Sequence, residues 1–137
     1  CEGDPFFYGS FMHLHARMQD KVDIEVVPGI TGMSACWTSL GIPFSWGDDS
    51  TLVLMGTLEK EKILSGLKQA DAVVIMKVGD HVDKVKNCLK EVGMLERAWI
   101  VENGSMENER IKKLSEYIPS KAPYFSVILV HGQGRRP

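Results

Sequence analysis

The sequence lacks any long apolar stretch, and no run approaches the roughly 20 residues that a transmembrane helix needs. It also lacks an excess of charge of either sign, because 16 Lys and Arg stand against 18 Asp and Glu and leave a net charge of −2. Such a balance provides no general basic field for a nucleic-acid backbone or for an anionic membrane surface. We therefore expect neither nucleic acid nor membrane among the partners of this protein.

Cysteine is scarce: Cys1, Cys36 and Cys88 are the three in the sequence, and they share no short spacing. This pattern predicts reduced thiols in a cytoplasmic protein and argues against a disulfide or zinc framework. His13 and His15 stand two positions apart, so on a helix they point to different faces and do not converge on one ion. We therefore expect no metal site.

The residues that are present fit a compact domain, since 44% are hydrophobic and 25% are charged. Helical and strand-like patterns alternate along the chain, which predicts α/β layers. The predicted helices are residues 8–20, 31–40, 59–69, 81–92 and 107–117, and the predicted strands are residues 24–27, 51–55, 70–78, 98–102 and 125–130. Residues 70–78 (ADAVVIMKV) are apolar on both faces, so we expect this strand in the interior of the sheet.

The turn at residues 3–9 (GDPFFYG) is a first candidate for ligand binding. Glycine lets the backbone approach a ligand closely, and Pro5 is suited to the first turn of a helix. The free N–H groups of a helix N-terminus favour a carboxylate. The same pattern is also typical of an ordinary Asp-capped turn, so this cluster alone leaves both interpretations open.

Residues 27–35 (VPGITGMSA) form a second candidate, in which a strand runs through a tight turn into a helix of small residues. Small residues let the backbone pack against a flat ligand, and either Thr31 or Gly32 caps the helix. The GxGxxG fingerprint of dinucleotide-binding proteins is absent. By itself this segment is also typical of an ordinary strand-to-helix turn.

Taken in order, these two clusters and Gly41-Ile42-Pro43 resemble the middle of a tetrapyrrole methylase. This family comprises S-adenosylmethionine-dependent enzymes of corrin and sirohaem synthesis. Residues 46–49 (WGDD), 74–79 (VIMKVG) and 123–126 (PYFS) narrow the resemblance to the branch that methylates precorrin-2 at C20 in cobalamin synthesis. The alternatives are methylation of another carbon, methylation of cobalt-precorrin-2, and a non-catalytic α/β fragment that only dimerises.

The resemblance implies a homodimeric α/β enzyme of two domains, with the cofactor and the tetrapyrrole in the cleft between them. It implies that residues 1–46 are the end of the N-terminal domain and residues 47–137 the C-terminal domain. The glycine-rich GxGPGD loop of the family has no match in this sequence, which begins inside a turn motif. We therefore interpret the chain as the C-terminal portion of a longer enzyme, with most of the N-terminal domain outside it.

The resemblance also implies where S-adenosylmethionine binds. By position, the residues that line the pocket are Gly3, Asp4, Tyr8, Gly9, Thr31, Gly32, Met76, Lys77, Pro123 and Tyr124. Many relatives carry two hydroxyl residues after the Pro-Gly turn, so Thr31 is the stronger candidate and Gly32 is expected to contribute backbone. We expect Asp4 and Thr31 to face the same cofactor cleft, because α/β sites form at the carboxyl ends of strands.

Methyl transfer from a sulfonium needs alignment more than it needs a catalytic triad, since the donor carries its own activation. A base is still needed for the proton on the methylated carbon, and Asp4, Asp48, Asp49 and Glu102 are conceivable acceptors. The sequence does not decide among them. Arg135 and Arg136 suit a polyanionic substrate, although such a terminal basic pair is also typical of a soluble tail.

Overall fold

The computed structural model describes residues 3–133 and shows two compact units, which divide between Ala35 and Cys36. Helix α2 (Gly32–Leu40) spans this division. Arg135 and Arg136 lie outside the described residues. The predicted domain boundary after residue 46 concerns the complete protein and stays a prediction.

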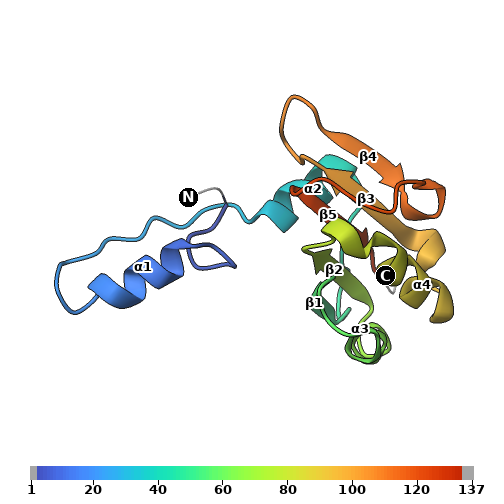
Figure 1. The fold of residues 1–137 in the computed structure, drawn as a ribbon, viewed down its shortest axis with the longest axis horizontal. Helices are drawn as coiled ribbons and strands as arrows, with labels where there is room; N and C mark the ends of the chain where they lie inside the picture. The colour runs from blue at the N-terminus through green and yellow to red at the C-terminus, as the bar shows by residue number, and fades with distance from the viewer. Residues whose placement is uncertain (1–2, 134–137) are drawn as a thin grey trace. The chain divides into compact units, whose positions relative to one another are not determined.

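The first unit contains helix α1 (Phe11–Met18) and an extended segment over residues 23–30 (Figure 1). The helix lies within the predicted range 8–20. The prediction of a strand at residues 24–27 is wrong for the described chain, because this segment has no ladder partner. Its backbone groups lack a neighbouring strand, and side chains such as Val27 and Ile30 are 73% and 75% exposed. Extended conformation alone does not make a strand.

The second unit is built on a five-stranded sheet with the order β1-β2-β5-β3-β4. Its strands are β1 (Thr51–Met55), β2 (Ala72–Met76), β3 (Ala98–Glu102), β4 (Arg110–Lys113) and β5 (Ser126–Val130). β1 and β2 are parallel, and every other neighbouring pair is antiparallel. The predicted interior position of the 70–78 strand is confirmed, since β2 lies between β1 and β5.

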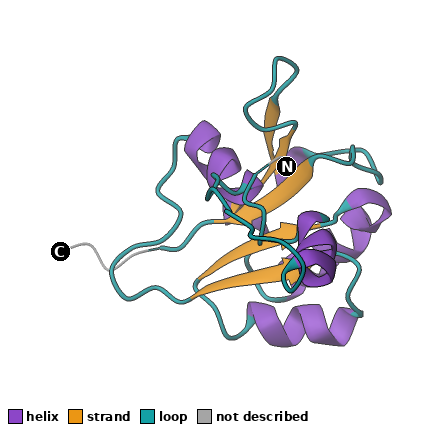
Figure 2. Cartoon of the chain, turned by 90° about the vertical axis from the view of Figure 1, so that its left-hand side faces the viewer, coloured by secondary structure: helices purple, strands orange, loops and turns teal. Residues whose placement is uncertain are grey.

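Two amphipathic helices, α3 (Lys60–Leu67) and α4 (Val82–Glu91), cover one face of the sheet (Figure 2). Alternate strand residues point to this face and form the core with the apolar sides of both helices. The fully buried members of this core include Ile63, Leu67, Ile75, Leu89, Ile100 and Ile128. None of the helices within residues 3–133 is long and apolar enough to cross a membrane.

Short 3₁₀ helices η1 (Gly79–His81), η2 (Leu95–Arg97) and η3 (Leu114–Glu116) connect the larger elements. The predicted helix at 107–117 is wrong, because its centre is β4 and its end is η3. Residue Ile111 pairs with Val101 of β3, so strand pairing overrides a weak helical pattern of spaced apolar residues. β4 is an edge strand, and its basic residues discourage pairing with another chain.

Arg97 ties together the ends of three neighbouring strands. Its Nη1 donates to the carbonyl oxygens of Asp71 at 2.7 Å and His131 at 2.8 Å. These carbonyls stand just before β2 and just after β5, while Arg97 itself precedes β3. Burial lowers the pKa of the guanidinium, which nonetheless remains charged at neutral pH.

Replacing Arg97 by Met keeps the stem of the side chain and removes both donors. We expect the free energy of unfolding to fall by about 2 kcal/mol, because hydrogen bonds to charged groups contribute about 1.5–3 kcal/mol each and this site is partly solvated. Urea denaturation followed by circular dichroism measures the change. Lys62→Met, at an exposed position of α3, is the control. An equal loss of unfolding free energy in both variants would contradict the role of Arg97 in joining the three strand ends.

Candidate functional site

The two turns predicted to bind a ligand lie against each other in the first unit. Gly3 has a φ of +77°, and a Cβ at this position would lie 3.4 Å from both the Ile30 oxygen and the Gly32 nitrogen. A Cβ at Gly29 would overlap the carbonyl of Gly3. Gly29 is therefore required by a close approach of two backbones that are far apart in the sequence, whereas Gly3 is favoured by its positive φ.

The carboxylate of Asp4 fastens this pair of turns. Its Oδ1 accepts the backbone N–H of Phe6 at 2.9 Å, and its Oδ2 accepts that of Gly29 at 3.1 Å. The side chain thus shapes its own turn and holds the second one. Because both oxygens accept backbone N–H groups, the structure gives Asp4 a role in organising the turns.

Thr31 caps helix α2, which decides between the two predicted capping residues. Its Oγ1 accepts the backbone N–H of Ser34 at 3.2 Å and shares a hydrogen bond with the Ser34 hydroxyl at 2.5 Å. At Gly32 a Cβ would meet no atom within 4 Å, so this side of the turn is open. Tyr8 has a φ of 54°, a conformation rare for a bulky residue, and its ring packs edge-on against Phe7.

A second group of predicted residues lies in the second unit, where β2 ends and β5 begins. We call this place the sheet edge. Ile75 of β2 pairs with Ile128 of the antiparallel β5, so the carboxyl end of β2 lies beside the amino end of β5. Met76 and Lys77 stand at the first of these ends, and Tyr124 precedes the second. The register therefore brings these two strand ends together, although nearly half of this unit's sequence separates them.

The backbone at this edge is tightly built. Gly56, which follows β1, donates its N–H to the carbonyl of Met76 at 2.7 Å. A Cβ at Gly56 would lie 2.9 Å from the carbonyl oxygen of Lys77, which itself has a φ of 53°. A left-handed conformation is uncommon in residues other than glycine, and it occurs more often at functional sites than elsewhere.

Tyr124 is the most exposed aromatic side chain at this edge. It is 90% exposed, and its ring packs edge-on against the ring of Phe125, which is 46% exposed, with 5.1 Å between the ring centroids. An aromatic ring that is exposed and yet supported by a second ring is suited to stack against a flat ligand. Pro123 precedes it in the same exposed segment.

The four conceivable proton acceptors differ in their surroundings. Asp4 and Asp49 accept backbone N–H groups within turns, and Asp48 is exposed in the same turn as Asp49. Glu102, at the carboxyl end of β3, is 7% exposed, and its Oε1 accepts the hydroxyl of Tyr117 at 2.5 Å. Sequence reasoning missed Tyr117, which it assigned to a helix. The sequence offered a signal for Glu102, which is an acidic residue at the end of the otherwise apolar run AWIVE, but none for Tyr117 as its partner.

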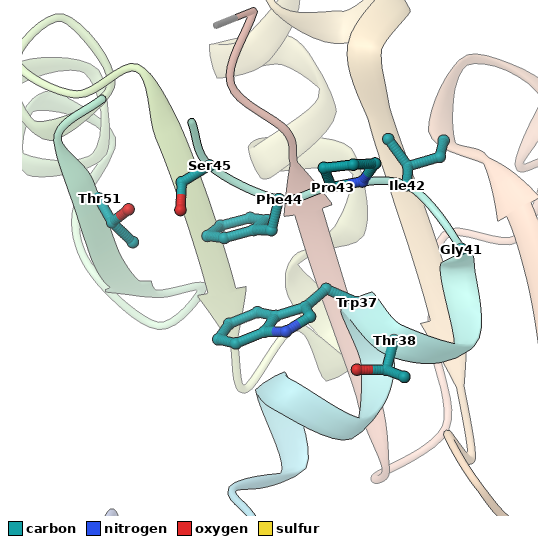
Figure 3. Close-up of a pocket in the computed structure, with 8 residues that line it drawn as sticks. All are labelled: Trp37, Thr38, Gly41, Ile42, Pro43, Phe44, Ser45 and Thr51. Atoms are coloured by element: carbon teal, nitrogen blue, oxygen red, sulfur yellow. The ribbon is translucent and has the colours of Figure 1, made fainter. Parts of the chain in front are cut away.

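A hollow of about 590 Å³ lies elsewhere in the second unit (Figure 3). Trp37 and Phe44 stack in it with ring centroids 4.9 Å apart, and the hydroxyl residues around them include Thr38, Ser45 and Thr51. It contains none of the predicted cofactor residues. Among residues 3–133, no group of His, Cys, Asp and Glu is placed to hold a metal ion.

The mixed sheet with flanking helices, together with tight turns built by glycine, defines an α/β protein. Residues 1–117 match the family model of the tetrapyrrole (corrin/porphyrin) methylases. The match covers most of the chain, and the protein therefore belongs to the tetrapyrrole methylase family.

Two relatives match almost the whole chain. A precorrin-2 C(20)-methyltransferase of a Sinorhizobium species is 46% identical over 136 residues, which cover 99% of this chain and 56% of the relative. A cobalt-precorrin-2 C(20)-methyltransferase of Salmonella typhimurium is 29% identical over 133 residues, which cover 96% of this chain and 56% of the relative. The chain thus spans little more than half the length of these relatives.

Solved structures confirm the predicted α/β methylase fold. A cobalt precorrin-4 methyltransferase aligns with a TM-score of 0.74 at 21% identity, covering 94% of this chain and 61% of that one. A uroporphyrin-III C-methyltransferase of Thermus thermophilus, complexed with S-adenosylhomocysteine, aligns with a TM-score of 0.62 at 21% identity, covering 96% and 63%. At these identities the alignments show a shared fold.

The pairing of the two turns can be tested through Asp4. Asp4→Asn replaces one acceptor oxygen by a donating amide, so either Phe6 or Gly29 loses the partner of its N–H. We expect hydrogen exchange of one of these amides to accelerate roughly three- to tenfold, as the net contribution of about 0.5–1.5 kcal/mol per hydrogen bond implies. NMR-detected exchange measures both sites. Asp20→Asn, which changes an exposed carboxylate, is the control. If both amides of Asp4→Asn exchanged at the wild-type rate, the role of Asp4 in holding the two turns together would be contradicted.

Proposed function

We propose that the complete protein transfers a methyl group from S-adenosylmethionine to C20 of precorrin-2 in cobalamin synthesis. The observation that carries this proposal is the 46% identity, over 99% of the chain, to the Sinorhizobium precorrin-2 C(20)-methyltransferase. The aligned sequence extends over nearly the whole chain and therefore includes both the paired turns and the sheet edge. The solved relative complexed with S-adenosylhomocysteine supports S-adenosylmethionine as the donor.

The residues of this chain fit such a donor in two places. The paired turns offer open backbone at Gly32 to a polar ligand, and the sheet edge offers an exposed, supported aromatic ring at Tyr124. We propose that Gly3, Asp4, Tyr8, Gly9, Thr31, Gly32, Met76, Lys77, Pro123 and Tyr124 bind the donor. Asp4 contributes by shaping the turns, and the open side of Gly32 admits the ligand.

When bound, the donor supplies a sulfonium-activated methyl group. The protein's task is then to hold the donor and the tetrapyrrole in line and to exclude water. In well-oriented systems such alignment is worth about 7–11 kcal/mol. We also expect the complete protein to be a cytoplasmic homodimer with a polycarboxylate tetrapyrrole as substrate. Cys36 and Cys88, which are free and buried, fit a reducing compartment.

The second candidate function is C20 methylation of cobalt-precorrin-2. The Salmonella relative, whose name refers to that substrate, covers 96% of the chain. Its identity of 29%, against 46% for the precorrin-2 relative, favours the metal-free substrate. Methylation of another carbon is the third alternative.

The decisive assay offers the complete protein S-adenosylmethionine with either precorrin-2 or cobalt-precorrin-2. We expect methylation at C20, identified by NMR of the product, with a kcat/KM for precorrin-2 at least about tenfold above that for the cobalt form, or about 1.4 kcal/mol in transition-state binding. Methylation of another carbon would contradict the assignment of C20. Absence of methyl transfer to either substrate would contradict the proposed function.

A calorimetric titration of S-adenosylhomocysteine into these 137 residues alone is the matching control. If part of the donor site lies in the complete protein outside these residues, the short chain lacks the hydrogen bonds which that part donates to the ligand. The loss of three such backbone hydrogen bonds weakens binding by about one to three decades relative to the complete protein. Equal affinity of the short chain and the complete protein would show that the described residues hold the whole site.

A further inference from the structure

The segment between η3 and β5, residues 117–125, carries Pro123 and Tyr124, and we name it the aromatic loop. It contains no helix or strand, yet it is attached at several points to other elements of the second unit. Its first residue, Tyr117, is buried, whereas Ile118 and Tyr124 are 92% and 90% exposed. Apolar side chains held at such exposure need a fixed backbone beneath them to present a defined surface.

Two contacts fix the beginning of the aromatic loop at Tyr117. Its hydroxyl donates to Oε1 of Glu102 at 2.5 Å, and both side chains are buried, at 5% and 7% exposure. Nζ of Lys86, on α4, donates to the backbone carbonyl of the same tyrosine at 2.6 Å. Tyr117 is therefore held both by β3 and by α4.

The rest of the aromatic loop is joined to the turn after β2 and to the end of β3. Ala122 donates its N–H to the carbonyl of Gly79 at 2.9 Å, and Lys121 pairs with Asp80 at 2.8 Å. The N–H of Asn103 donates to the carbonyl of Phe125 at 2.7 Å. The loop thus connects η1 with the end of β3.

These contacts differ in strength. The Lys121–Asp80 pair is exposed on both sides, and such pairs contribute little in water. The Tyr117–Glu102 hydrogen bond is buried and has a carboxylate acceptor, which makes it one of the strong kinds. Burial and the neighbouring carboxylate of Glu102 raise the pKa of Tyr117, so its hydroxyl keeps the donated proton.

Ser126 provides no substitute for the tyrosine. It is the cross-strand partner of Glu102 in the β3–β5 ladder, and its hydroxyl is buried without a hydrogen-bond partner among the described residues. The carboxylate at the end of β3 is therefore joined to the aromatic loop through Tyr117.

We infer that Glu102 and Tyr117 are positioning residues, which hold the aromatic loop so that Pro123 and Tyr124 receive the S-adenosyl donor at the sheet edge. This inference rests on the proposed function, because it assigns a task to the same ligand site. It gives Glu102 a role in binding the donor, not in removing the proton from the methylated carbon. The ring of Tyr124 then meets the ligand without first having to be ordered.

The test measures the dissociation constant of S-adenosylhomocysteine for the complete protein and three variants by calorimetry. Tyr117→Phe keeps the ring and loses the donor, and we expect binding to weaken about tenfold, as the loss of a hydrogen bond to a carboxylate implies. Glu102→Gln keeps an acceptor oxygen and is expected to weaken binding less than Tyr117→Phe. Ile63→Val, in the core beneath α3, is the control for lost stability and is expected to bind like the wild type.

A second readout is independent of the ligand. Lys121 is exposed in the aromatic loop, so the rate of tryptic cleavage after this residue, followed by mass spectrometry, reports local opening. We expect Tyr117→Phe to accelerate this cleavage and Ile63→Val to leave it unchanged.

The outcomes separate the two hypotheses. Failure of the wild type to bind would contradict the proposed function and the ligand part of the inference, while cleavage after Lys121 still tests the anchoring of the loop. Wild-type binding with an unchanged affinity in Tyr117→Phe would overturn the positioning role alone. So would an equal loss of affinity in Ile63→Val, or a greater loss in Glu102→Gln than in Tyr117→Phe.

Discussion

The insertion of β5 between β2 and β3 is the constraint on which the second unit depends. β5 comes from the end of the described chain and forms antiparallel ladders on both sides, and all five of its residues are buried. Without it, the parallel pair β1–β2 and the antiparallel pair β3–β4 would share no hydrogen bonds. Its register also decides which segments meet, because it places the end of β2 beside the beginning of β5 and Ser126 opposite Glu102.

A comparable constraint acts in the first unit, where the carboxylate of Asp4 holds two turns together across the sequence. Gly29 makes room for that contact, Gly3 supplies the positive φ of the facing turn, and Thr31 caps helix α2 beside them. The first unit thus exposes the backbone of the paired turns, and the second unit exposes the aromatic side chain of Tyr124 at the sheet edge. This division agrees with the proposal that alignment of donor and acceptor, rather than a catalytic triad, is what the protein supplies.

Local sequence patterns predicted most of the second unit, since β1 and β3 begin and end at the predicted residues and α3, α4 and β5 lie within the predicted ranges. They failed for residues 107–117, because the pairing of Ile111 with Val101 depends on a strand that is distant in space until the chain folds. The paired turns were identified as motifs, but the hydrogen bond from Gly29 to Asp4 is a tertiary contact without a local signal. Tyr117 was missed for the same reason: its partner Glu102 is specified by the sheet and not by spacing.

A crystal structure of the complete protein with S-adenosylhomocysteine tests most directly whether the sheet edge of the second unit binds the donor. We expect the ligand to contact the ring of Tyr124, with Tyr117 still donating to Glu102. A ligand that occupies the hollow beside Trp37 and Phe44, or that does not contact Tyr124, would contradict this expectation.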